Sequence, residues 1–332
     1  MSAHTVDGMD HRPDDHADKR ADNRSEIRDF LATRRAKITP EQVGLPTSGR
    51  RRVPGLRREE VAVLAGVSTE WYTRLEKGHI GGVSEDVLNA VGQALRLDHD
   101  ERTYLFDLAR AARPARRTPS RRKDIAVPHP VRWLLDSVTL SAAFVRNGRM
   151  DVVATNPLAR ALHAPMFDSD TTGGRGHANI ARYHFLDPGA HHFFVDWDAA
   201  ARATVALLRA EAGREPHDRA LRGLIGELST LSPDFRTLWA AHDVRIHHDG
   251  VKPLHHPEVG RLDLTYRSLD LPTSHRSVYE LTFYTAEPGS TSEDRLKLLA
   301  SLAAGAGAGS GAGSGARSTT TEPTARREAR RA

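Results

Sequence analysis

The sequence contains no cysteine and no long apolar run. Without cysteine, disulfide bonds and thiolate metal sites are excluded. No stretch approaches the roughly 20 apolar residues that span a bilayer. The N-terminal residues also lack the apolar core of a signal peptide. We therefore expect a cytoplasmic protein that does not bind membranes.

Aromatic residues are scarce, at 6% of the 332 residues, and the net charge of +5 is modest. The length exceeds that of one small module and predicts two domains with tails. Arginine is concentrated at 50–52, at 57–58 and between 110 and 123. Such local positive charge is typical of a surface that contacts a polyanion.

Shifts in composition divide the chain. We predict a disordered tail at 1–24, a helical domain at 25–112, a Pro- and Arg-rich linker at 113–127, a second domain at 128–302 and a low-complexity tail at 303–332. The first helix is expected to begin near Ser25 or Glu26.

The stretch from Leu56 to Gly78 predicts a helix, a short turn and a second helix. Gly66 ends the first helix, because glycine tolerates positive φ, and Ser68 is a favourable N-cap for the second. At 3.6 residues per turn, the apolar residues of the second helix fall on one side, which packs against the domain, and the polar residues fall on the other, which is available to a partner. This layout is typical of a helix-turn-helix that inserts one helix into the major groove of DNA.

The second domain mixes strand and helix patterns. Asn147-Gly148 lies between two β-rich runs and predicts a hairpin with a type I′ turn. Three helices are expected at 198–213, 218–230 and 233–242. Alternation then predicts antiparallel strands at 243–248, 251–256, 260–269 and 275–286.

LRREEVAVLAGVSTEWYTRLEKG and SEDVLNAVGQALRLDHDERTYLFDLARAA resemble the Xre/Cro-type DNA-binding domain of actinobacterial MmyB-like transcription regulators. The resemblance continues through GRMDVVATNPLARAL and HHPEVGRLDLTYRSLDLP, and covers about residues 25–302. It implies a multidomain α and α+β fold: a five-helix helix-turn-helix domain, then a PAS-like antiparallel sheet with helices that binds a ligand.

The family pattern assigns tasks to the second helix of the motif. Expected base contacts are Thr69, Glu70, Thr73 and Arg74, because arginine suits guanine, glutamate suits cytosine and a threonine methyl suits thymine. The alternative for Glu70 and Arg74 is a surface ion pair at i,i+4 spacing. Expected phosphate contacts are Arg57, Arg58, Ser68, Lys77, Arg50, Arg51 and Arg52. For the last three, the alternative is a solvated loop.

Other residues of the motif are expected to hold the helix in place. These structural residues are Arg35, Trp71, Tyr72, Leu75 and Glu76, and by resemblance Glu76 pairs with Arg35. We expect double-stranded DNA as the partner and a homodimer, since paired half-sites are the usual arrangement.

Catalytic and metal-binding patterns are weak. Five histidines between 242 and 256 raise a metal site as an alternative, but neighbours on a strand point to opposite faces. GGRG at 173–176 lacks the Lys-Ser/Thr of a phosphate-binding loop. We expect no metal, no cofactor and no enzyme activity.

The resemblance implies an apolar, fatty-acid-like ligand in the second domain. Pocket candidates are the large apolar and aromatic residues Phe144, Phe185, Trp197, Phe235, Trp239, Tyr266 and Tyr279. A polar anchor is sought among Arg182, Tyr183, Arg236 and His242. The alternative is a dimerisation or partner-docking module with a filled core and no ligand.

Overall fold

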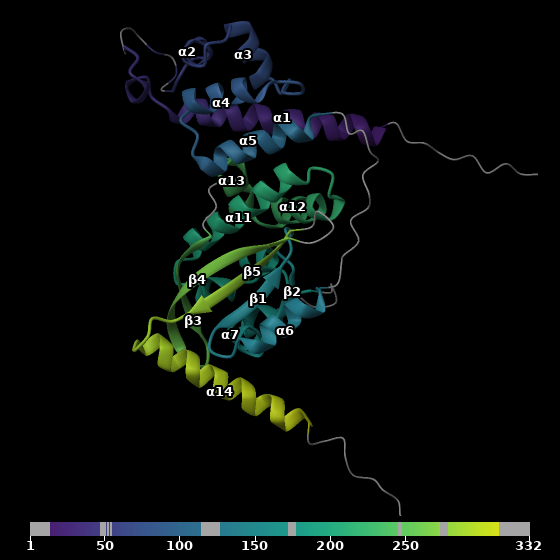
Figure 1. The fold of residues 1–332 in the computed structure, drawn as a ribbon, viewed down its shortest axis with the longest axis vertical. Helices are drawn as coiled ribbons and strands as arrows, with labels where there is room; N and C mark the ends of the chain where they lie inside the picture. Colours follow the sequence, from purple (N-terminus) through teal and green to yellow (C-terminus); the bar gives the residue numbers. More distant parts are fainter. Residues whose placement is uncertain are drawn as a thin grey trace, which may run out of the picture.

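The structure is a computed structural model that describes residues 14–46, 51, 53, 55–113, 127–171, 177–244, 248–272 and 278–311. A helical domain lies at one end of the molecule and a sheet domain at the other, with α11, α12 and α13 between them (Figure 1). The predicted combination of an α domain and an α+β domain is confirmed.

Where the structure describes it, the helical domain contains the five α-helices predicted for it. They are α1 (Asp14–Lys37), α2 (Arg58–Leu64), α3 (Thr69–Glu76), α4 (Glu85–Ala94) and α5 (His99–Ala111), with a short 3-10 helix, η1 (Glu41–Val43). Local capping sets their starts: Ser84 accepts from Val87 N at 3.4 Å, and Asp98 forms a capping box with Glu101. Their apolar stripes meet in one core that includes Phe30.

α1 begins at Asp14, so the prediction of a disordered tail through residue 24 is wrong for 14–24. This part of the sequence has no apolar stripe, and hydrophobic periodicity therefore does not detect it. Residues 1–13 lie outside the described residues. A similar correction applies at the other end, where α14 (Thr291–Gly311) continues beyond residue 303.

Within the described part of the chain, the sheet has five antiparallel strands in the order β2-β1-β5-β4-β3. These are β1 (Ala142–Arg146), β2 (Val152–Thr155), β3 (Asp249–His256), β4 (Gly260–Pro272) and β5 (Val278–Thr285). In the register, Phe144 of β1 lies opposite Thr155 of β2 and Thr282 of β5. β1 and β2 precede the intervening helices in the chain and β3, β4 and β5 follow them, so the sheet joins the two ends of the domain.

Successive residues of β1 point to opposite faces of the sheet. Ala142 and Phe144 join the core formed with the helices that follow β2, whereas Ala143 and Val145 pack with Leu135 of α6 (His129–Ser137). Helices therefore contact both faces of the sheet.

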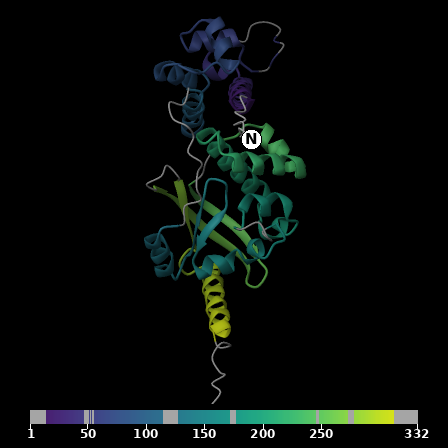
Figure 2. The same ribbon diagram turned by 90° about the vertical axis from the view of Figure 1, so that its right-hand side faces the viewer.

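Between β2 and β3, the described helices are short near the sheet and longer toward the helical domain. They are α7 (Pro157–Leu162), α8 (Ala164–Phe167), α9 (Ile180–Leu186), α10 (Ala190–Phe193), α11 (Trp197–Arg214), α12 (Arg219–Leu231) and α13 (Pro233–Ala240). The three helices predicted between 198 and 242 are confirmed as α11, α12 and α13. α14 leaves the sheet domain at the end away from the helical domain (Figures 1 and 2).

The hairpin at Asn147-Gly148 is present, but its predicted type I′ turn is wrong. In the loop from 147 to 150 the residue with positive φ is Met150, at 67°. Asn147 Oδ1 instead accepts from the backbone N–H groups of Arg149 and Asp151, which closes a longer loop. Gly148 is needed for space, since a Cβ there would lie 2.1 Å from the Glu211 side chain.

The strand predicted at 243–248 is also wrong where it is described. Asp243 and Val244 have no strand structure, and 245–247 lie outside the described residues. Val244 is 1% exposed and packs in the core of the helical domain. Its apolar character reflects a contact between domains.

Candidate functional site

α3 presents one polar face to solvent. Thr69, Glu70, Arg74 and Lys77 are exposed, and Thr73 is half-buried. Within the described residues, no hydrogen bond or ion pair joins the side chains of Glu70 and Arg74. The alternative of a surface ion pair therefore has no support, and both side chains are available to a ligand.

The opposite face of α3 packs into the core of the helical domain. Tyr72 and Leu75 are at most 1% exposed, and Trp71 packs at the edge of the same core. Gly66 has a φ of 65°, and the Ser68 side chain accepts from Trp71 N at 3.1 Å. Both features were expected from the sequence, because capping acts over only a few residues.

Glu76 is 1% exposed and binds two arginines. Arg35 donates to its carboxylate from Nε at 3.0 Å and from a terminal nitrogen at 2.9 Å, which is the pair expected by resemblance. Arg58 donates to the same carboxylate at 3.0 Å. Burial alone would raise the pKa of Glu76, but the two arginines outweigh it and lower the pKa. Arg58 therefore helps to orient α3, besides its predicted phosphate role.

In the basic loop before α2, one arginine side chain is hydrogen-bonded to other residues of the protein. Arg51 makes two hydrogen bonds of 2.8 Å to Glu60 and one of 3.0 Å to the Gly55 carbonyl. The hydrogen bond from Arg51 is the main cause that lowers the pKa of Glu60 to about 2. These contacts give Arg51 a structural role in the protein, whereas its expected phosphate contact stays a prediction. Arg50 and Arg52 lie outside the described residues.

A cavity of about 390 Å³ opens between the sheet and the helices that cover it. Its lining is mainly apolar and includes Phe144, Met150, Met166, Ile180, Phe194, Leu207, Tyr266 and Tyr284. Its size lies within the range of small-molecule sites. The sheet domain therefore has space for a small ligand.

Two cations line this cavity, within the described residues, and they differ in their partners. Arg146 pairs with Glu280 at 2.6 Å. Lys252 makes neither a hydrogen bond nor an ion pair with any described residue; its ammonium lies 5.6 Å from the ring centres of Phe194 and Tyr266. Burial, and then the charge of Arg146, lower the pKa of Lys252 to about 8.

Of the aromatic pocket candidates, only Phe144 and Tyr266 line the cavity. The other five fill cores. Phe185, Phe235 and Trp239 pack together beneath α12, Trp197 stacks on His191, and Tyr279 packs against α6 on the other face of the sheet. A single sequence does not show which aromatic residues line a pocket and which fill a core, because both use the same residue types.

Of the polar-anchor candidates, Tyr183 lines the cavity and the others do not. Tyr183 lines the cavity, and its hydroxyl has no partner among the described residues. Arg236 donates to the Ser229 carbonyl, and His242 lies at the contact between the domains. The sequence did not single out Lys252, although it shares a strand face with the buried Leu254, and this position was the available signal.

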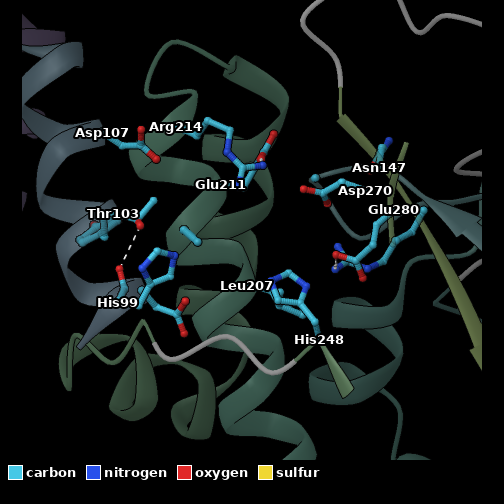
Figure 3. A pocket seen from close by; sticks show the side chains of 15 residues that line it. His99, Thr103, Asp107, Asn147, Leu207, Glu211, Arg214, His248, Asp270 and Glu280 are labelled. Atoms are coloured by element: carbon cyan, nitrogen blue, oxygen red, sulfur yellow. Dashed lines mark hydrogen bonds and ion pairs between the residues drawn. The ribbon is translucent and has the colours of Figure 1, made fainter. Parts of the chain in front are cut away.

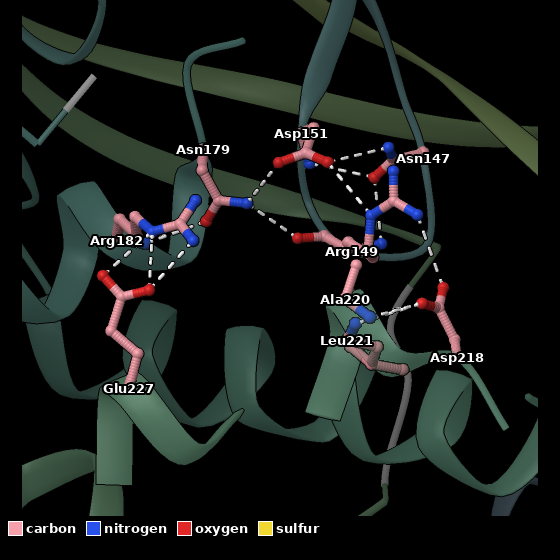
Figure 4. A network of polar contacts seen from close by, with 9 residues as sticks. All are labelled: Asn147, Arg149, Asp151, Asn179, Arg182, Asp218, Ala220, Leu221 and Glu227. Carbon is pink, nitrogen blue, oxygen red and sulfur yellow. Dashed lines mark hydrogen bonds and ion pairs between the residues drawn. The ribbon is translucent and has the colours of Figure 1, made fainter. Parts of the chain in front are cut away.

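Arg182, the fourth anchor candidate, belongs to a polar network that ties the β1–β2 loop to the neighbouring helices (Figure 4). It pairs with Glu227 of α12 at 2.9 Å. Asn179 donates to the Arg149 carbonyl at 2.8 Å and to Asp151 at 2.7 Å. Arg182 therefore stabilises the fold through this ion pair, and it does not line the ligand cavity.

A second hollow, of about 270 Å³, lies between the domains (Figure 3). Its walls include three groups of residues: His99, Thr103 and Asp107 of α5; Leu207, Glu211 and Arg214 of α11; and Asn147 of the β1–β2 loop with Asp270 and Glu280 of the sheet. Arg146, Leu207 and Glu280 also line the larger cavity. The two hollows therefore share a wall.

Two family models match the chain. Residues 26–105 match a helix-turn-helix domain. Residues 127–299, more than half of the chain, match the ligand binding domain of MmyB-like transcription regulators. The chain belongs to the MmyB-like transcription regulators. It is thus a DNA-binding transcription regulator with a ligand-binding domain, as the sequence resemblance implied. A search among curated proteins finds no match.

In this regulator, the described residues contain neither a helix long and apolar enough to cross a membrane nor a group of three His, Asp or Glu side chains that would hold a metal ion.

The two domains of the regulator are joined through α11. On one side, Ala200, Thr204 and Leu207 line the ligand cavity. Farther along, the fully buried Arg209 forms an ion pair with Glu26 of α1. Gly213 lies so close to Tyr104 of α5 that a Cβ there would be 2.4 Å from the ring. One helix therefore contacts both the cavity and the DNA-binding domain.

Proposed function

We propose that this regulator reads a specific operator with α3 and that a small, fatty-acid-like ligand in the sheet domain sets its affinity for that operator. The observation that carries the DNA part is the exposed polar face of α3, fixed from behind by Tyr72, Leu75 and Glu76. A rigid helix with free polar side chains is what direct base readout requires.

Within that face we assign base contacts to Thr69, Glu70, Thr73 and Arg74. Arg74 and Glu70 make no hydrogen bond to each other, which supports their use on bases. Arginine matches the two acceptors of guanine, and glutamate accepts from the amino group of cytosine.

Phosphate contacts are assigned to Arg57, Arg58, Ser68 and Lys77. The first two stand at the start of α2, and Lys77 follows α3 on its exposed side. The Ser68 oxygen already accepts from Trp71 N, but its O–H remains free to donate to a phosphate. We further propose a homodimer on a two-fold operator, since a single helix-turn-helix offers only a small interface.

For the sheet domain, the cavity supports a ligand more than a docking module with a filled core. An apolar ligand would contact the face of α11 that carries Ala200 and Thr204, while Arg209 on the same helix contacts the DNA-binding domain. Ligand binding would change DNA affinity only if it favours one arrangement of the two domains over another.

The test selects bound sequences from a random DNA library with the full chain, and then compares Arg74→Ala and Lys77→Ala at fixed salt. A base reader should lose about 1–3 kcal/mol on the selected site alone, whereas loss of a phosphate contact weakens all DNA and flattens the salt dependence. Arg261→Ala, which changes an exposed residue at the start of β4, is the control. Equal losses for Arg74→Ala on selected and random DNA would remove its assignment.

A further inference from the structure

An apolar patch lies on the outer surface of the sheet domain, away from the ligand cavity. α6 buries Leu135 against the face of the sheet that does not line the cavity. The rest of the helix leaves Trp133 67% and Leu134 43% exposed, and Leu140, just beyond its end, is 77% exposed. Large apolar side chains gathered on a surface in this way mark an interaction site.

The sheet extends this patch beyond α6. Leu269 of β4 pairs with Leu281 of β5, and Leu281 lies in the same apolar cluster as Leu135. Paired residues of antiparallel strands have their side chains on the same face. Leu281 is 2% exposed, whereas Leu269 is 50% exposed. α6 therefore covers only part of this face, and the apolar surface continues past it.

Two opposite charges of α6 accompany Trp133. Arg132 and Asp136 are exposed, and they make neither a hydrogen bond nor an ion pair with any described residue. At 3.6 residues per turn, both lie on the same side of the helix as Trp133. Their order, with the cation nearer the N-terminus, is the less favourable one for an ion pair within a single helix. Both charges are therefore available to a partner.

This pattern is complementary to itself. A two-fold axis brings the same surface of two copies together and, for a helix that crosses the axis, makes the pair antiparallel. Arg132 and Asp136 stand at equal distances on either side of residue 134, so antiparallel pairing about this point sets Arg132 of each copy beside Asp136 of the other. The Trp133 side chains meet between these charges. A second copy of the chain thus supplies the matching surface.

We propose that α6, with Leu269 at its margin, forms the surface through which two copies of this chain associate. This assignment rests on the homodimer proposed above and names the surface that forms it. Tryptophan at the centre of an interface often carries much of the binding energy, and flanking charges select the orientation of the partner. α3 lies at the far end of the molecule from α6, so this pairing leaves both reading helices open (Figure 1).

Sedimentation of the full chain over a range of concentrations measures the dissociation constant of the dimer. Trp133→Glu should raise this constant by about 100-fold, because a charge replaces the central apolar contact. Leu231→Glu is the matched control, since Leu231 is 61% exposed at the end of α12, outside the patch. It should leave the constant unchanged. Thermal unfolding of each variant shows whether it is folded.

An exchange of charges tests the antiparallel arrangement. Arg132→Asp and Asp136→Arg should each weaken the dimer by about 10-fold, because each sets like charges against one another across the interface. The two substitutions combined restore opposite charges, and the dissociation constant should return to that of the wild type.

The outcomes separate this surface from the homodimer itself. A dimer that persists unchanged in Trp133→Glu overturns the surface but not the homodimer. Recovery that fails in the combined variant overturns the antiparallel arrangement. A wild-type chain that stays monomeric at every concentration overturns both the surface and the homodimer, and leaves the base contacts assigned to α3 intact.

Discussion

Arg209 of α11 is fully buried, and its guanidinium forms an ion pair with the Glu26 carboxylate of α1. Tyr104 of α5 donates to the same carboxylate at 2.6 Å, and Arg209 lies over the Trp239 ring at 4.0 Å. The pair joins the two domains; the Arg209 side chain is closed to water and that of Glu26 is 24% exposed. Loss of the pair should therefore be felt in both domains.

Glu26→Gln should therefore destabilise the contact between the domains. It leaves the Arg209 charge buried without an opposite charge, and breaking a buried pair in this way typically costs about 3–5 kcal/mol. Hydrogen exchange in α5 and α11, together with urea unfolding, would measure the effect. Glu293→Gln removes an exposed pair with Lys297 and should cost little. Unchanged exchange in Glu26→Gln would show that the pair does not hold the domains together.

Gly213→Ala should also separate α11 from α5. The added methyl group would lie 2.4 Å from the Tyr104 ring, which is itself 2% exposed and has little room to move. We expect a loss of about 1–3 kcal/mol, the usual cost of overpacking. Gly223→Ala on α12 is the control, because nothing lies within 4 Å of its added Cβ. This control should gain up to about 1 kcal/mol from helix propensity. Equal thermal stability of the two variants would contradict the close approach.

Glu76→Gln should destabilise the DNA-binding domain by about 3–5 kcal/mol, because Arg35 and Arg58 lose the carboxylate between them. Urea unfolding measures the loss. Glu59→Gln serves as the control, since its pair with Arg57 is exposed on both sides and should contribute less than about 1 kcal/mol. If the two variants prove equally stable, Glu76 does not organise the domain.

Without ligand, the stability of the protein should rise with pH between about 8 and 10.4 through Lys252. The unfolded chain holds this proton up to a pH of about 10.4. The folded protein releases it near pH 8, because burial and the charge of Arg146 lower the pKa. In that window the unfolded state binds more protons, so the free energy of unfolding increases with pH.

Lys252→Met isolates this contribution to the pH dependence. Subtracting its urea-unfolding profile from that of the wild type removes the groups common to both. A flat difference between pH 8 and 10.4 would mean that Lys252 is well solvated in the folded protein.

Local patterns were enough to predict much of the DNA-binding domain. The αL turn at Gly66 and the cap at Ser68 depend on neighbours within a few residues, and they appear as expected. The same is true of the buried side of α3. The long first helix was underestimated because its start carries no apolar stripe.

By contrast, the partners of the polar side chains were decided by the tertiary structure. Arg51 was expected on phosphate, but the fold brings Glu60 to it. The Asn147-Gly148 pair was expected to form a tight turn, but side-chain hydrogen bonds from Asn147 close a longer loop. In each case the deciding contact depends on the surrounding fold.

The sequence by itself therefore determined the two-domain plan, the helix-turn-helix and the side of α3 that faces outward, because periodicity and capping are local. Only the tertiary structure decided which aromatic residues line the cavity and which fill the cores. It also placed Lys252 without a partner among the described residues and set α11 against both domains. These features are assembled from residues far apart in the chain, and a single sequence does not specify which of them meet.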